Sequence, residues 1–158
     1  MEQQTKNNLS SKINQEDFKK FQSAFENNGY FFNNTQSLLA AYLADKFYEL
    51  PRKGLSGILL TGEPGVSKTH FAESLAKVDD AELLEYQCVA STTDEQLYAT
   101  INTVGLVKKT NPVSDGILVR AINNANAGKK TILLVDEIDK GNENIDPYFL
   151  TFFQKGAI

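Results

Sequence analysis

The first third of the chain carries apolar residues at helical spacing. In EDFKKFQSAFENNG three phenylalanines lie three and four positions apart, which predicts an amphipathic helix that stops at Asn28-Gly29. The stretch TQSLLAAYLADKFYEL has a second apolar face and predicts a helix over about 35–50, which Pro51 ends. Stripes of this kind are typical of a packed core rather than of a ligand site.

Beyond residue 55 short apolar runs alternate with stretches of helical spacing. The expected strands cover 58–61, 82–88 and 131–135, and the expected helices cover 68–77, 93–107, 114–128 and 146–156. Strands that alternate with helices predict an α/β fold, in which helices cover a parallel sheet. The expected domain organisation is a disordered polar tail over 1–15, N-terminal helices over 16–54 and the α/β core over 55–158.

Composition narrows the class of protein. The chain has 158 residues, 16 of them basic and 20 acidic, and its net charge of −4 gives no footprint for direct nucleic-acid binding. The single cysteine excludes a disulfide framework within the chain and fits a reducing compartment. No apolar run approaches the roughly 18 residues of a membrane span. We therefore expect a cytoplasmic protein with no membrane partner.

The stretch GEPGVSKT, residues 62–69, follows the first expected strand and opens a helix. It fits the phosphate-binding pattern G-x-x-x-x-G-K-[ST] except that Ser67 stands where the second glycine is expected. His70 follows on the first turn of the helix, where an incidental position is the simpler interpretation of a lone histidine. The candidate nucleotide-binding residues are Gly62, Glu63, Pro64, Gly65, Val66, Ser67, Lys68, Thr69 and His70.

The chemistry of such a loop explains its residue types. Successive backbone N–H groups converge on one point, and the positive end of the helix adds to them, which makes a cradle for a polyphosphate. Lys68 is expected to reach the outer phosphates, and the hydroxyl of Thr69 is expected to ligate Mg²⁺. If position 67 is left-handed, serine costs on the order of 1–2 kcal/mol relative to glycine, which ligand binding can absorb.

A second motif lies about seventy residues further on, where the apolar run ILLV meets acid. Asp136 ends the expected strand and is placed to hold Mg²⁺ through its water shell. Glu137 is placed to orient and deprotonate an attacking water. The alternative is an apolar strand that simply meets a solvated acidic loop, and the glycine loop upstream argues against it. Asp139 and Lys140 are interpreted as solvated residues.

This combination resembles the AAA+ ATPases, with GEPGVSKT as Walker A and LLVDEID as Walker B. The segments EYQCVASTTDEQLY and SDGILVRAINNAN are similar to the MoxR-type and dynein-related branch, in which alanine is frequent where Ser67 stands. The resemblance covers about 30–158. It implies a P-loop NTPase three-layer sandwich that binds Mg-ATP, with Thr69 and Asp136 at the metal and Glu137 as the catalytic residue. It also implies a homo-oligomeric ring, hexameric in the family.

The resemblance ends in the helix after Walker B. In the family a sensor-1 strand, an arginine finger and a helical lid follow, and the sensor-1 strand lies between the Walker A and Walker B strands. We therefore expect a truncated core in which those two strands face a gap or close up directly. Hydrolysis is expected where a longer partner or the full assembly supplies the missing elements.

Three other functions stay open on the residues alone. One is a nucleotide-binding switch module without turnover, and another is a GTP-using restriction subunit similar to McrB. The last is a degenerate domain with no ligand, against which the intact Lys68, Thr69, Asp136 and Glu137 argue.

Overall fold

The computed structural model describes residues 14–48, 57–101, 103–141 and 149 of the chain. Its elements are helices α2 (Gln15–Asn27), α3 (Thr35–Tyr48), α4 (Lys68–Val78), α5 (Asp94–Tyr98), α6 (Thr103–Lys108) and α7 (Ile117–Asn126), strands β1 (Glu82–Gln87), β2 (Ala99–Ile101), β3 (Val113–Asp115) and β4 (Thr131–Asp136), and the 3-10 turn η1 (Ile138–Lys140). Within those ranges no helix is long and apolar enough to cross a membrane.

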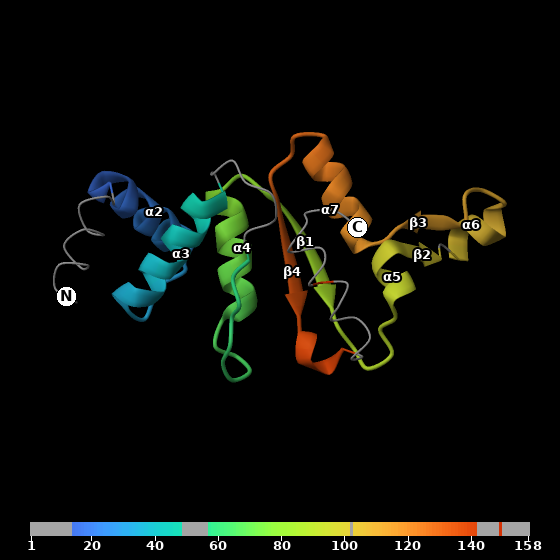
Figure 1. Ribbon diagram of the computed structural model, residues 1–158, viewed down its shortest axis with the longest axis horizontal. Coiled ribbons are helices and arrows are strands. Elements are labelled where there is room, and N and C mark those ends of the chain that lie inside the picture. The colour runs from blue at the N-terminus through green and yellow to red at the C-terminus, as the bar shows by residue number, and fades with distance from the viewer. Residues whose placement is uncertain (1–13, 49–56, 102, 142–148, 150–158) are drawn as a thin grey trace.

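A parallel pair of strands forms the middle layer. β1 pairs with β4 in a register that runs from Glu82 opposite Thr131 to Gln87 opposite Asp136. Figure 1 shows α4 on one side of this pair and α7 on the other, with α2 and α3 outside α4. The expected α/β fold with a parallel sheet and N-terminal helices is confirmed. Parallel pairing suits this arrangement because both faces of the strands are covered.

An aromatic cluster joins the N-terminal helices to α4. Phe25 has no exposed surface, and its ring lies 4.9 Å from that of Phe21, 5.0 Å from that of Phe32 and 5.6 Å from that of Phe71. Ring pairs at these separations stabilise beyond the area they bury. The phenylalanine stripe of α2 is therefore core, as its spacing predicts.

A second core lies on the other face of the strand pair. Its buried members are Leu84, Cys88, Leu97, Ile117, Leu118, Ala121 and Phe149. Leu133 and Val135 of β4 pack against this cluster, whereas Ile132 packs against the aromatic cluster. Alternate residues of one strand thus serve the two cores, as the period of two in a strand requires.

The strand expected over 58–61 is not formed. Residues 57–63 have no regular secondary structure, and β4 pairs only with β1 in the part of the chain that is described. Ile58 and Leu59 are 41% and 81% exposed. An isolated segment has no ladder to satisfy its backbone, so apolar composition alone does not make it a strand. The segment and β4 therefore do not close up onto each other, which was one of the two expected arrangements.

The single helix expected over 93–107 is also wrong, because α5, β2 and α6 divide this segment. Ala99 is extended, with φ −145° and ψ 142°, and β2 pairs antiparallel with β3. The backbone N–H of Gly116 donates to the carbonyl of Tyr98 at 2.7 Å. The strand pairing overrides the helical periodicity of the sequence. The resulting two-stranded ribbon and α6 project beyond α5 in Figure 1.

Other boundaries shift by a few residues. A capping box begins α5, where the N–H of Thr93 donates to the Gln96 side chain at 3.2 Å. Helix α7 begins after Gly116 rather than at position 114, because Ser114 and Asp115 belong to β3. The helix expected over 146–156 lies outside the described residues except for Phe149.

Replacing Phe25 with alanine should lower the free energy of unfolding by about 3–5 kcal/mol, because it opens a cavity among rings that have little room to relax. Urea denaturation of the wild-type and variant chains measures the loss. Phe31→Ala is the matched control, since this side chain is 69% exposed. A loss for Phe31→Ala as large as that for Phe25→Ala would contradict the assigned core.

Candidate functional site

The glycine loop leads directly into the N-terminus of α4. Gly62 and Gly65 have φ of +153° and +83°, values that side chains rarely allow. A Cβ at Gly62 would also lie 3.0 Å from Cγ2 of Val66. The loop side chains from 62 to 67 are exposed, whereas Lys68, Thr69 and His70 are half-buried on the first turn of α4. Both glycines of the loop therefore hold backbone conformations that favour glycine.

Ser67 occupies the left-handed region, with φ 65° and ψ 28°, immediately before α4. Its side chain makes no capping hydrogen bond to the helix. The conformation that glycine favours is thus present at the position where the motif expects glycine, and the serine holds it at a cost of about 1–2 kcal/mol. Its hydroxyl is left available to a ligand rather than used as a cap.

The Lys68 side chain folds back over the loop. Its Nζ donates to the carbonyl oxygens of Gly62 and Glu63, both at 2.9 Å. The ammonium therefore sits above the loop backbone, where an anion in the cradle would meet it. A bound phosphate would replace two neutral acceptors with a charged one, and hydrogen bonds to charged groups are the stronger kind.

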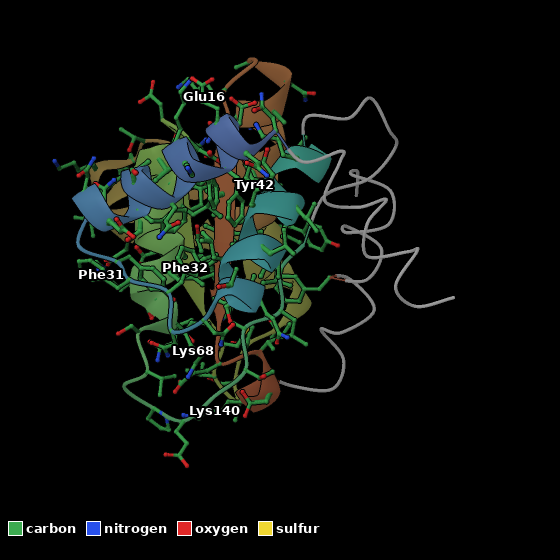
Figure 2. All side chains as sticks on the ribbon, turned by 90° about the vertical axis from the view of Figure 1, so that its left-hand side faces the viewer. Glu16, Phe31, Phe32, Tyr42, Lys68 and Lys140 are labelled. Atoms are coloured by element: carbon green, nitrogen blue, oxygen red, sulfur yellow. The ribbon has the colours of Figure 1, made fainter. Side chains whose placement is uncertain are left out.

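The acidic strand end lies at the same end of the structure as the loop. Figure 1 shows the glycine loop below α4 and the η1 turn below β4, and Figure 2 shows Lys68 and Lys140 at that same end. The strand ladder extends past Asp136, whose carbonyl accepts from the Cys88 N–H at 2.9 Å. One oxygen of the Asp136 carboxylate accepts from the Glu137 N–H at 2.9 Å.

Both carboxylate oxygens of Glu137 are engaged. Oε1 accepts from Nζ of Lys140 at 2.5 Å, and Oε2 accepts from Nε2 of Gln87 at 3.0 Å. The hydrogen bond from Lys140 and then that from Gln87 lower the pKa of Glu137, and the charge of Lys68 adds to the effect. Glu137 is also left-handed, with φ 52°. In this conformation the carboxylate is ionised and paired, so accepting a proton from water requires release from these partners.

Two residues at this end of the strands were not predicted as site residues. Lys140 was interpreted as solvated and its side chain is 59% exposed, and it also pairs with Glu137 three residues earlier. Gln87 ends β1 directly opposite Asp136 in the parallel register. The spacing of Lys140 from Glu137 was a usable signal, because residues three apart meet on a helical turn. The position of Gln87 required the strand register, which the sequence does not specify.

His70 links α4 to the connection between α2 and α3. Its Nδ1 lies 3.3 Å from Oε2 of Glu73, and its Nε2 lies 3.5 Å from the carbonyl oxygen of Gly29. The rings of His70 and Tyr30 are 5.6 Å apart. The side chain therefore has structural partners on its own helix and on the preceding segment, next to the candidate loop.

The donors expected for a magnesium ion are the Thr69 hydroxyl and the Asp136 carboxylate. Both are hard oxygen ligands of the kind Mg²⁺ prefers, and Mg²⁺ is typically held by one or two protein oxygens together with substrate phosphates and water. No group of three or more histidine, cysteine, aspartate or glutamate side chains within the described ranges is arranged to hold a metal alone. The donor set therefore fits a metal that arrives with a phosphate ligand.

A family comparison agrees with the site. The model described as AAA domain, dynein-related subfamily, matches residues 57–156, which is more than half of the 158-residue chain. The chain therefore belongs to the dynein-related subfamily of AAA domains. This confirms the predicted AAA+ P-loop ATPase family and its dynein-related branch. The finer MoxR-type assignment stays a prediction.

Two curated relatives match over part of their length. The chain is 31% identical over 104 residues to replication-associated recombination protein A of Escherichia coli strain K12 and, to the same degree, of Escherichia coli O157:H7. The matched region is 66% of this chain and 19% of each relative, so the chain spans about a fifth of the length of these proteins. No solved structure was found to match.

Replacing Ser67 with glycine should raise the free energy of unfolding by about 1 kcal/mol, because the left-handed conformation no longer carries a Cβ. Chemical denaturation of both chains measures the gain. Ser67→Ala is the matched control, since it removes the hydroxyl but keeps the Cβ. An equal gain for Ser67→Ala would assign the effect to the hydroxyl instead of the backbone.

Proposed function

We propose that this chain is the nucleotide-binding core of an AAA ATPase and binds Mg-ATP at residues 62–69. The observation that carries the proposal is the left-handed backbone of Ser67 at the start of α4, because it is the loop conformation that a phosphate cradle needs even though the residue is not glycine. Membership of the dynein-related AAA subfamily supports the same ligand.

The loop and Lys68 would hold the polyphosphate. The backbone N–H groups and the N-terminus of α4, an eleven-residue helix, favour an anion at this point. Lys68 would exchange its contacts with the Gly62 and Glu63 carbonyls for a phosphate oxygen. His70 would lie at the edge of the site, because its partners Glu73 and Gly29 hold it beside the first turn.

Thr69 and Asp136 would hold the magnesium ion, and Glu137 would act on water. The ion supplies charge neutralisation at the phosphates when bound. Glu137 would orient a water and accept its proton as the water oxygen attacks the terminal phosphorus and the bond to the leaving phosphate oxygen breaks. This role requires the carboxylate to leave Lys140 and Gln87, which occupy both of its oxygens here.

At the level of the whole protein we propose a MoxR-like motor, a chaperone-type ATPase that acts as a homo-oligomeric ring, hexameric by family resemblance. The chain spans 19% of the curated relatives it matches, so turnover is proposed for the full assembly rather than for this chain alone. The relatives are named as recombination proteins, and we propose no recombination activity for this chain.

The second candidate is a nucleotide-binding switch module without turnover. The engagement of Glu137 by Lys140 and Gln87 favours it, because a paired carboxylate of lowered pKa is a weak base. A GTP-using protein similar to McrB also stays open. It would bind the phosphates in the same way but would select guanine instead of adenine.

Titration calorimetry with Mg-ATP and Mg-GTP should give saturable binding that Lys68→Ala weakens by about 10- to 100-fold, the equivalent of a charge-assisted hydrogen bond. Lys77→Ala is the control, since Lys77 is an exposed lysine in the last turn of the same helix. The nucleotide that binds with the higher affinity shows whether the protein uses ATP or GTP. A folded sample that takes up neither nucleotide would contradict the proposal.

Glu137→Gln should leave the affinity for Mg-ATP within about twofold, because the carboxylate is assigned to water and not to the phosphates, while phosphate release falls by at least about 100-fold. Phosphate release is measured on the assembled protein. Asp139→Asn, the exposed carboxylate of the same turn, is the control. An assembly whose wild-type form binds but never releases phosphate is the switch module instead.

A further inference from the structure

Strands β2 and β3 and helix α6, which we call the ribbon arm, project from the body of the structure (Figure 1). Their base is firmly attached, because the N–H of Gly116 donates to the Tyr98 carbonyl at 2.7 Å and the neighbouring Leu97 and Leu118 have no exposed surface. A Cβ at Gly116 would collide with the backbone of Leu97. The second core therefore fixes the point at which the ribbon arm leaves the body.

The ribbon arm exposes apolar side chains that its own fold does not bury. Val107 is 84% exposed and Ile101 is 75% exposed, and Val104, Leu106 and Val113 are each more than half exposed. Ile101 and Val113 are paired across the two strands, so their side chains form one continuous surface. Exposed apolar patches of this kind are typical of interaction sites.

Two lysines add positive charge to this surface. Val104, Val107 and Lys108 lie three and four positions apart in α6 and therefore share one face of the helix. Lys109 follows directly, and both lysine side chains are exposed. No acidic residue occurs from position 96 to position 114, although the chain as a whole has a net charge of −4. The ribbon arm thus combines an apolar surface with a local positive charge.

We propose that the ribbon arm binds an acidic, apolar peptide segment of a partner protein. The exposed valines, leucine and isoleucine would bury apolar side chains of that segment, and Lys108 and Lys109 would face its carboxylates. Charge complementarity selects this class of partner, because opposite charges orient a complex while apolar burial supplies much of its affinity. The inference does not rest on the proposed nucleotide binding, since the ribbon arm is attached to α5 and α7 rather than to the glycine loop.

Polyanions would also attract the two lysines but fit the rest of the surface less well. A nucleic acid is bound largely through phosphate contacts with many lysine and arginine side chains, and an anionic membrane attracts clusters of them. The ribbon arm has only two such residues beside its five exposed apolar side chains. The net negative charge of the chain also opposes both polyanions.

The test is an NMR titration of the isotope-labelled full chain with a peptide made of leucine and glutamate. Amide signals of the ribbon arm should shift until they saturate, and those of α2 should not. A peptide with lysine in place of every glutamate and one with serine in place of every leucine are the matched probes. Both should bind at least about 10-fold more weakly, because each lacks one half of the proposed complementarity.

Substitutions in the chain test the same surface from the other side. Val107→Ser should weaken binding of the leucine–glutamate peptide by about 5- to 10-fold, because an apolar contact is lost. Phe31→Ser is the matched control, since Phe31 is 69% exposed and lies between α2 and α3, and it should leave the affinity unchanged.

Charge reversal gives a second, independent readout. The double substitution Lys108→Glu and Lys109→Glu should reverse the preference, so that the leucine–lysine peptide binds more tightly than the leucine–glutamate peptide. The combination of Lys19→Glu and Lys129→Glu changes the net charge equally at exposed lysines outside the ribbon arm. This control should keep the original preference.

Several results would overturn the proposal. One is a ribbon arm whose signals do not shift with the leucine–glutamate peptide, and another is equal binding of all three peptides. Shifts caused by single-stranded DNA or phosphatidylserine vesicles but not by the peptide would assign the surface to a polyanion. Self-association that Val107→Ser abolishes, measured by sedimentation, together with no peptide binding, would assign the surface to a second copy of the chain.

Discussion

The parallel register of β1 and β4 is the constraint on which the other arrangements depend. In this register Ile132 packs against the aromatic core and Leu133 packs against the second core, so β4 contacts both helical layers. The same register sets Gln87 opposite Asp136 and thereby brings a carboxamide to Glu137. A slip of one residue would exchange the two faces of β4 and remove this contact as well.

Helix α4 connects the packing around the strand pair to the position of the glycine loop. Phe71 and Leu75 are buried in the aromatic core, so the first turn of the helix is fixed by packing rather than by a side-chain cap. Ser67 and Glu137 both hold left-handed backbone at this end of the structure. Strained residues of this kind persist only where the surroundings over-determine them, and they cluster at functional sites. Ser67 and Glu137 are two of the four described non-glycine residues with positive φ, and the other two, Asp80 and Lys109, lie outside the candidate site.

The sequence predicts those parts of the structure that local rules govern. The helix over α2, the loop motif and the paired strands follow from spacing, glycine positions and apolar runs. The strand expected at 58–61 and the helix expected over 93–107 are wrong for one reason, which is that pairing between distant segments decided them. The contact between Lys140 and Glu137 could be predicted from their spacing. The Gln87–Glu137 and Lys130–Asp79 contacts join residues 50 and 51 positions apart, so predicting them required the strand register.

Two of the residues expected to act on nucleotide have protein partners in this conformation. Lys68 bonds to loop carbonyls, and Glu137 bonds to Lys140 and Gln87, so a ligand must offer more than these contacts to displace them. A ligand shifts a conformation only by the difference in its affinity for the two states. For Lys68 that difference is supplied by exchange of neutral carbonyls for a phosphate. For Glu137 a nucleotide anion offers no attractive replacement, so its release depends on the exposed side chains of Lys140 and Gln87 turning away from it. The proposed nucleotide binding would therefore not by itself free the carboxylate for the proposed turnover.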